Sequence, residues 1–236
     1  MNATDRSSTS NRMAEDSCEK LQEILELASS LGVVVGPVRF YSKPDPSSIT
    51  KVSAEETALP SVSIFPLYSW YHSGWDTEPD VTHPESVRME QAIPFQTRWG
   101  DFTFCSWPSH IVPADEDITD LKRNSLTLPL AFAALNEPFL PSKEGNSKQV
   151  DYLKDPLLRD KEAVISFSHF VPRVELSPEK RFLIDPKLAA VIGSDPLEEQ
   201  IRRLLPDLPL FGHTHIPIDL TIDGITYIQW PLGYHR

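Results

Sequence analysis

The sequence of 236 residues predicts a mixed α/β fold. Two short apolar runs of strand type, residues 163–168 and 208–211, lie on either side of a helical segment, residues 195–205. Two further strand-like runs, 218–222 and 225–229, flank Asp223-Gly224, which is a strong two-residue hairpin signal. Strands that alternate with a helix and end in a hairpin indicate a mixed sheet.

The N-terminal part combines a polar tail, one helix and one strand. Residues 1–15 are rich in Ser, Thr and Asn without an apolar period, so we expect a disordered tail or loop. Residues 16–31 carry apolar side chains on one helical face, with Asp16 or Ser17 as a cap at the start and Gly32 past the end. Residues 41–60 are polar and predict a loop. Residues 62–68 predict a buried strand that Pro66 interrupts.

The middle of the chain is less regular. Residues 69–113 carry many aromatic side chains but no sustained period, which is typical of loop-rich structure packed on a core. Residues 119–136 predict a helix with a break near Pro129, and residues 141–161 a polar surface loop.

In the last third, residues 189–192 predict a further short strand. The helix at 195–205 has Asp195 as its expected cap, Pro196 in its first turn and Glu198 completing a capping-box pattern.

Charge and composition exclude several classes of protein. The formal net charge of −12 opposes binding to a nucleic-acid backbone, although a bound metal can attract a phosphorylated substrate. Two cysteines, Cys18 and Cys105, without a CxxC pattern indicate neither a disulfide framework nor a thiolate zinc site. No apolar run approaches the ~20 residues of a membrane span, and the N-terminus has no secretory apolar region. We therefore expect a cytoplasmic protein that does not bind membranes.

Three histidines follow predicted strands. His169 comes directly after the run 163–168, and His213 and His215 follow 208–211 in the string Gly-His-Thr-His. In extended chain the i, i+2 spacing points both rings to one side, and ligands collect at the carboxyl ends of strands. Neutral imidazole binds Zn, Fe, Mn and Ni. These histidines are predicted metal ligands, and hydrogen-bonded structural histidines are the alternative.

Two other residues are candidate substrate ligands. His72 lies near the end of the strand at 62–68, and packing among aromatic residues is its alternative role. Arg173 follows His169 closely and has the donor geometry to bind phosphate, with pairing to a carboxylate as its alternative. The acidic cluster at residues 76–80 predicts a solvated loop, with a role near a metal as the minority interpretation.

The histidine strings resemble the last two motifs of calcineurin-like metallophosphoesterases. The resemblance is carried by Ser168-His169 and by residues 211–217, and residues 67–72, 76–80 and 193–203 are similar to a eukaryotic branch of that family. It extends from about residue 16 to the end of the chain.

The resemblance implies a fold and an activity. It implies a layered β-sandwich with flanking helices, here incomplete at the N-terminus, so that residues 16–236 form a partial phosphoesterase domain. It implies hydrolysis of phosphate esters with two Mn, Fe or Zn ions, of which His169 and His213 would hold one and His215 the other. The substrate would be a phosphorylated small molecule or a phosphoprotein.

The chain departs from the family pattern in its N-terminal motifs. It contains no Asp-x-His, Gly100-Asp101 follows the wrong elements, and Gly145-Asn146 precedes Ser147 instead of a histidine. Without a bridging carboxylate, the three histidines suit one Zn²⁺ with a water better than a dinuclear centre. An incomplete sheet would also expose an edge for a partner.

Three interpretations stay open. The chain is a metal-dependent phosphoesterase whose N-terminal motifs are missing from this sequence, or a non-catalytic metal-binding or interaction protein of the same ancestry. In the third interpretation, it is an α/β protein whose histidines are structural.

Overall fold

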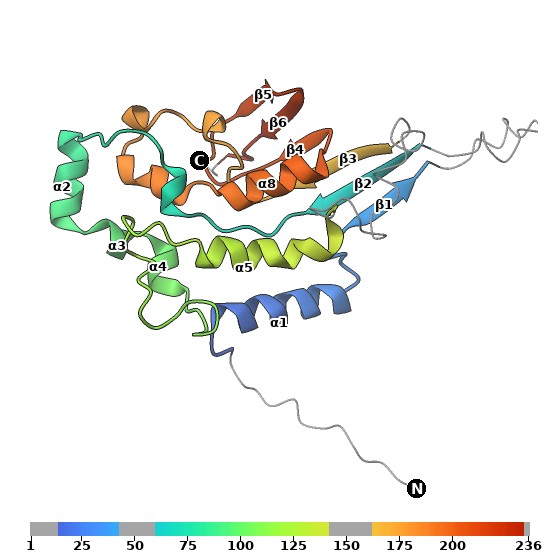
Figure 1. The fold of residues 1–236 in the computed structure, drawn as a ribbon, viewed down its shortest axis with the longest axis horizontal. Coiled ribbons are helices and arrows are strands. Elements are labelled where there is room, and N and C mark those ends of the chain that lie inside the picture. Colours follow the sequence, from blue (N-terminus) through green and yellow to red (C-terminus); the bar gives the residue numbers. More distant parts are fainter. Residues whose placement is uncertain (1–13, 43–59, 142–161, 234–236) are drawn as a thin grey trace, which may run out of the picture.

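The protein is built around one six-stranded mixed sheet (Figure 1). The structure, a computed structural model, describes residues 14–42, 60–141 and 162–233. The strand order is β1-β2-β3-β4-β6-β5. The strands are β1 (Val38–Tyr41), β2 (Ser61–Pro66), β3 (Glu162–Phe167), β4 (Leu208–Leu210), β5 (Ile218–Ile222) and β6 (Ile225–Gln229).

The centre of the sheet is parallel and its edges are antiparallel. Strands β2, β3, β4 and β6 pair in parallel, while β1 and β5 pair antiparallel at the two edges. The predicted mixed α/β class is confirmed, and the described residues form this single sheet rather than the two sheets of a sandwich. Parallel pairing places the carboxyl ends of β2, β3 and β4 along one edge, where ligand sites of α/β proteins lie.

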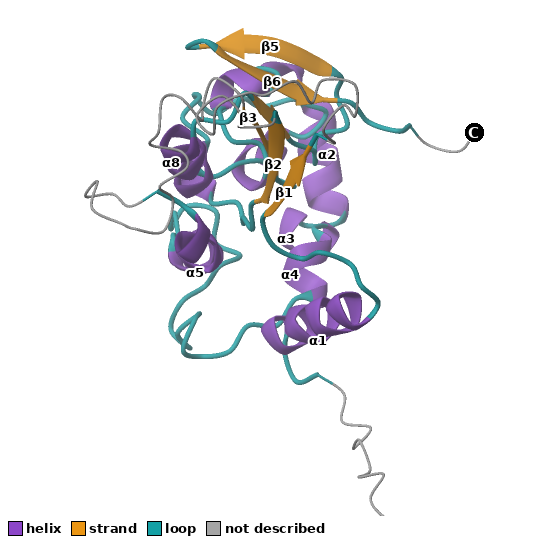
Figure 2. Ribbon diagram, turned by 90° about the vertical axis from the view of Figure 1, so that its right-hand side faces the viewer, coloured by secondary structure: helices purple, strands orange, loops and turns teal. Residues whose placement is uncertain are grey.

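Helices flank the sheet. Helices α5 and α8 lie together on one side of it (Figure 2), and Figure 1 places α2, α3 and α4 beyond the carboxyl ends of the parallel strands. The α-helices are α1 (Ser17–Ser30), α2 (Pro84–Ala92), α3 (Phe95–Arg98), α4 (Gly100–Phe104), α5 (Thr127–Asn136) and α8 (Asp195–Leu204). The 3-10 helices are η2 (Ser73–Trp75), η3 (Glu137–Phe139), η5 (Val174–Leu176), η6 (Lys180–Phe182) and η7 (Pro186–Val191).

Helix α8 contributes one apolar face to the core. Its residues Leu197, Ile201 and Leu204 are buried at helical spacing and join the main apolar cluster. The buried Gln200 accepts a hydrogen bond from Asn136 Nδ2 at 2.7 Å, which links α8 to the end of α5. Because a buried amide without a partner is costly, this pair sets the register between the two helices.

Several sequence predictions are confirmed. Asp16 caps α1 by accepting bonds from the backbone N–H groups of Cys18 and Glu19. The hairpin turn has Asp223 at φ 52° and Gly224 at φ 82°, as a type I′ turn requires. The strand expected at 62–68 is β2, and Pro66 is its last residue, where the missing N–H matters least.

The strand predicted at 189–192 is wrong, because residues 189–191 end the 3-10 helix η7 and Ile192 is its C-cap. Asp185 starts that helix by accepting a bond from Lys187 N–H, and Pro186 occupies its first position. The run is apolar because all four residues are buried, and a short buried run does not distinguish a strand from a helix.

Two helix predictions need correction at their starts. Helix α5 begins at Thr127, so Pro129 lies in the first turn, where no intrahelical N–H bond is lost and no kink results. In α8 the N-cap is Ser194, whose side chain makes no capping bond, and Asp195 is the first helical residue. The expected capping box around Asp195 is therefore not formed.

Other predictions concern parts that the structure describes incompletely. The stretch 69–113 contains three short α-helices among its loops. Most of the expected tail at 1–15 and of the loops at 41–60 and 141–161 lies outside the described residues. Within the described ranges, no helix is long and apolar enough to cross a membrane.

Candidate functional site

His169 and His213 lie at the carboxyl ends of adjacent parallel strands. His169 is two residues beyond β3, and His213 is three residues beyond β4. Backbone bonds continue the strand pairing past both ends, because Ser168 N–H donates to Leu210 O at 3.0 Å and Gly212 N–H to His169 O at 3.1 Å. This continued pairing brings the two imidazoles together, as the sequence predicts.

The two rings are in direct contact. His213 Nδ1 is 3.0 Å from His169 Nε2, and the ring centroids are 4.9 Å apart. His213 Nε2 is 3.0 Å from the carbonyl oxygen of Val191. Because a carbonyl only accepts, the proton of neutral His213 belongs on Nε2, and the lone pair on Nδ1 faces His169. In the absence of a cation, His169 Nε2–H then donates to that lone pair.

Both imidazoles favour the neutral form. The pKa of His213 is lowered to about 4, mainly because the ring is buried. Repulsion from His169 and His215 lowers this pKa further, whereas the hydrogen bond to Val191 raises it. Burial also lowers the pKa of His169, while nearby Asp101 opposes this effect. At neutral pH both rings therefore carry the lone pairs that a metal ligand needs.

The loop that carries His213 and His215 is turned, not extended. Both residues have positive φ, 76° and 59°, and Thr214 N–H donates to Gly212 O at 3.0 Å. The expectation that an extended backbone aligns the two rings is therefore wrong. His215 is exposed, yet it lies near enough to affect the pKa of both other histidines.

The left-handed loop is held by β6. Gln229 Nε2 donates to Thr214 Oγ1 at 2.6 Å and to Ile216 O at 2.5 Å. A residue other than glycine in the left-handed region costs about 1 kcal/mol or more, and such positions concentrate at functional sites. Two of them in three residues indicate that the loop geometry serves the side chains it presents.

The histidine pair fits two ligand positions of one divalent cation. Nitrogen atoms that each lie about 2.1 Å from a metal are about 3.0 Å apart at an octahedral angle and about 3.4 Å apart at the tetrahedral angle of zinc. The separation of 3.0 Å between His213 Nδ1 and His169 Nε2 matches the octahedral case. Val191 O accepts from the other nitrogen of His213, as the outer partner of a metal-bound histidine commonly does. Across the described ranges, no three His, Cys, Asp or Glu side chains are grouped as a ligand set. The pair therefore fits a mononuclear site with further positions open to water or substrate.

His72 is buried and engaged by the protein on both ring nitrogens. Nδ1 is 2.7 Å from Asn124 Oδ1, and Nε2 accepts from the backbone N–H of Asp195 at 3.3 Å. Asn124 adopts a left-handed φ of 48° and also accepts from Gly74 N–H. These contacts favour a packing role at the start of α8, and the substrate role of His72 stays a prediction.

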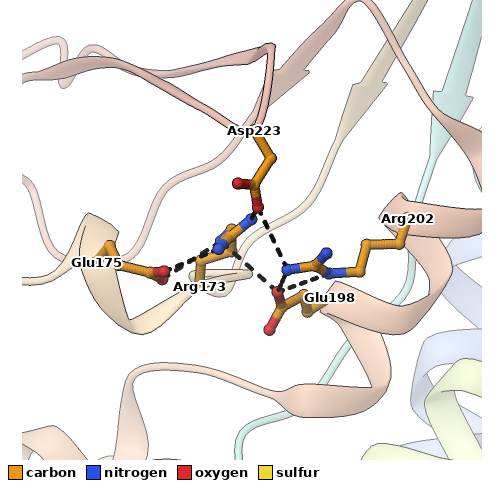
Figure 3. A network of polar contacts seen from close by, with 5 residues as sticks. All are labelled: Arg173, Glu175, Glu198, Arg202 and Asp223. Atoms are coloured by element: carbon orange, nitrogen blue, oxygen red, sulfur yellow. Dashed lines mark hydrogen bonds and ion pairs between the residues drawn. The ribbon is translucent and has the colours of Figure 1, made fainter.

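Arg173 is enclosed by carboxylates (Figure 3). Its Nη1 lies 2.7 Å from Asp223, its Nη2 2.8 Å from Glu175, and its Nε 3.6 Å from Glu198. The bonds to Glu175 and Asp223 raise its pKa further. Since the side chain is only 8% exposed, the geometry favours a role in joining η5, α8 and the hairpin turn. Binding of phosphate by Arg173 stays a prediction.

The acidic run at 76–80 is more ordered than a solvated loop. Buried Lys180 pairs through Nζ with Asp76 at 2.6 Å and with Asp80 at 3.2 Å, and its backbone N–H donates to Glu78. These bonds attach the loop to η6 and give the acidic residues a structural role.

The sequence pattern does not predict the aromatic surroundings of the pair or the influence of a carboxylate on it. Phe170 contacts both imidazoles, with ring centroids 4.9 Å from His169 and 4.8 Å from His213. Trp99 meets His213 edge-on at 5.9 Å. The charge of Asp101 opposes the lowering of the His169 pKa by burial. Only the dipeptide Gly100-Asp101 hinted at this position, and its place in the chain argued against it.

Comparison with known proteins supports the fold alone. No family model matches the chain, and no curated protein matches it. Among solved structures, it is similar to the crystal structure of a phosphopantetheinyl hydrolase from Mycobacterium tuberculosis, with a TM-score of 0.51 and 14% sequence identity. The match covers 96% of this chain and 65% of the hydrolase chain, so this chain corresponds to less than two thirds of that protein.

Proposed function

We propose that this chain is a phosphoester hydrolase whose site is the histidine pair at the ends of β3 and β4, with one divalent cation held by His169 and His213. The observation that carries the proposal is the 3.0 Å separation of the two facing ring nitrogens at that edge of the sheet. The fold likeness to a protein named as a phosphopantetheinyl hydrolase supports it at the level of architecture. Its substrate is a phosphorylated small molecule or a phosphoprotein.

Each residue of the pair has a distinct task. His213 presents Nδ1 because Val191 O holds its Nε2–H, and His169 presents Nε2 toward the same point. With its proton on Nδ1 instead, neutral His169 would present a lone pair on Nε2, and His169 and His213 would then hold the cation between them. When bound, a divalent ion polarises a phosphoryl oxygen and lowers the pKa of a bound water. His215 is exposed on the same loop, close enough to affect the pKa of both other histidines.

The test is hydrolysis by the full chain. We expect turnover of bis(p-nitrophenyl) phosphate in the presence of Mn²⁺, Fe²⁺ or Zn²⁺, and loss of that turnover in His213→Ala. His110→Ala is the matched control, since His110 is an exposed histidine in a turn, and it should retain wild-type rates. Hydrolysis that persists in His213→Ala would reject the proposed site.

A second candidate function is metal binding without catalysis. The observation that favours it is the lack of a third His, Cys, Asp or Glu ligand beside the pair within the described residues. This candidate predicts about one equivalent of bound metal, lost in His213→Ala, with no turnover of phosphate mono- or diesters. Metal analysis together with the hydrolysis assay separates the two candidates.

A further inference from the structure

The two faces of the sheet differ in how they are covered. Phe65 of β2 and Val164 of β3 are buried, and both belong to the apolar core cluster that includes the buried face of α8. Because side chains alternate along a strand, their neighbours in sequence, Ile64 and Ile165, point to the opposite face of the sheet.

Three apolar rows cross that opposite face, which we refer to as the open face. Each row can be followed from strand to strand, because paired residues of neighbouring strands point to the same side. The middle row is Val38, Ile64, Ile165 and Leu208. One outer row is Phe40, Val62 and Ala163. The other is Pro66, Phe167, Leu210 and Ile228.

The open face stays outside the core. None of its residues is buried, and Phe40 and Phe167 are 55% and 47% exposed. Among the residues that the structure describes, none of the three rows joins the main core cluster or packs against it. Parallel strands carry apolar residues on both faces where both faces are covered. The open face therefore has the composition of an interior and the exposure of a surface.

The chemistry of the open face suits a second copy of the same face. The three rows contain no charged side chain that would require an opposite charge on a partner, and apolar sheet faces pack on one another about 10 Å apart. Toward β5 the same face becomes polar, with Asp219, Thr221 and Thr226. An apolar centre with a polar border is the usual composition of a protein interface.

The area suits a dimer of moderate affinity. Rows that cross five strands at a spacing of about 4.8 Å, and span five residues at about 3.3 Å each, cover about 400 Å² in plan. The relief of the side chains adds to this area, so two copies bury on the order of 1,000 Å² together, which is near the lower limit of a specific interface.

We propose that the open face is the contact surface of a two-fold symmetric homodimer with a dissociation constant in the micromolar range. Ile165 lies on β3, the middle one of the five strands. A two-fold axis through the centre of the rows therefore brings Ile165 close to its own copy. This inference does not depend on a cation at the histidine pair.

Sedimentation equilibrium of the full chain tests the contact. Between about 2 and 200 µM, the average mass of the wild type should rise from that of one chain toward that of two. Ile165→Glu places two carboxylates against each other and should weaken association at least about 100-fold. Phe167→Glu, at a more exposed position, should weaken it at least about tenfold. Leu27→Glu, at an exposed leucine of α1, adds the same charge elsewhere and should associate as the wild type does.

Salt dependence distinguishes an apolar contact from one that ion pairs hold together. Each copy has a net charge of −12, so two copies repel each other. Raising NaCl from 50 mM to 500 mM screens this repulsion and should tighten the wild-type dimer several-fold. A dimer that weakens over the same range would be held by ion pairs, which contradicts an apolar contact.

The outcomes decide between the open face and other surfaces. A wild-type chain that is still a monomer at about 200 µM overturns the proposal and leaves the open face to a different protein. Equal dimerisation of the wild type, Ile165→Glu and Phe167→Glu overturns it too, as does equal weakening by Leu27→Glu. Circular dichroism and the urea midpoint establish that each variant is folded, and if Ile165→Glu does not fold, Phe167→Glu decides.

Discussion

His213 is the residue whose protonation is most sensitive to its surroundings. The ring packs between Phe170 and Trp99 and contacts His169, while Val191 O holds the proton of its Nε2. Burial therefore lowers its pKa from 6.5 to about 4. As pH falls below 6.5, this histidine takes up a proton in the unfolded chain before it does so in the folded chain. The free energy of unfolding therefore decreases.

This shift predicts acid sensitivity in the metal-free protein. The contribution of His213 to the free energy of unfolding is complete above about pH 6.5 and declines as pH falls toward 4. Between pH 7.5 and pH 5.0, the free energy of unfolding should fall by about 2 kcal/mol less in His213→Gln than in the wild type. Urea unfolding in the presence of a chelator measures this difference. An unchanged pH dependence in His213→Gln would contradict it, and His110→Gln serves as the control.

At the residue scale, the sequence predicts that two of the three histidines meet, but not how their rings are oriented. His169 and His213 meet as expected, because each follows a strand and parallel strands end at the same edge. The orientation of the rings was not predictable, since it depends on the left-handed φ of His213 and on the distant Val191 carbonyl. The aromatic neighbours of His213 were not predictable either, because Trp99 and Phe170 reach it through tertiary contacts.

At the scale of elements, the polar network in Figure 3 joins parts of the chain that share no backbone pairing. Arg173 directly precedes η5, Glu198 and Arg202 belong to α8, and Asp223 occupies the hairpin turn. Arg202 Nη2 extends the network, 2.7 Å from Glu198 and 3.7 Å from Asp223. The network anchors the edge hairpin to the helix that packs on the sheet.

Removing the central cation of this network should destabilise the fold. Arg173→Ala removes the shortest ion pair of both Glu175 and Asp223 and leaves Asp223 only the longer contact with Arg202. Because both carboxylates are at least half exposed, we expect a modest loss of about 1–2 kcal/mol. Arg181→Ala, at an exposed pair with Glu179, should cost less than about 0.5 kcal/mol. Urea unfolding compares them. A rise in KM for a phosphoester without loss of stability would instead support phosphate binding by Arg173.

Turns and helix caps were predictable where the sequence pattern has a single, local cause. The turn at Asp223-Gly224 and the cap at Asp16 follow from local backbone chemistry, so both appear where the sequence places them. Residues 189–192 are apolar because the whole molecule buries them, and that pattern has no period to show a helix. The position of α5 relative to Pro129 likewise needed knowledge of where the helix begins.

At the scale of the whole molecule, the segment from Val191 to Asp195 connects the candidate site with the core. Val191 O binds His213, Ile192 O accepts from Val171 N–H, and Gly193 O accepts from His72 N–H. The segment passes so close to Trp75 that a β-carbon on Gly193 would lie 2.2 Å from its ring and 2.6 Å from Val171 O. At this point of close approach, only glycine fits without movement of its neighbours.

The close packing around Gly193 predicts that Gly193→Ala lowers both the stability of the fold and its affinity for a metal. Forcing a methyl group against the Trp75 ring and the Val171 backbone should cost about 1–3 kcal/mol, because neither neighbour has a flexible end to move aside. The displaced segment carries the carbonyl that orients His213, so Mn²⁺ affinity should fall several-fold even where the variant remains folded. Gly36→Ala is the matched control, since a β-carbon there meets nothing within 4 Å. If Gly193→Ala unfolds in urea at the wild-type midpoint, then residues 191–195 adjust without cost and do not couple the candidate site to the core.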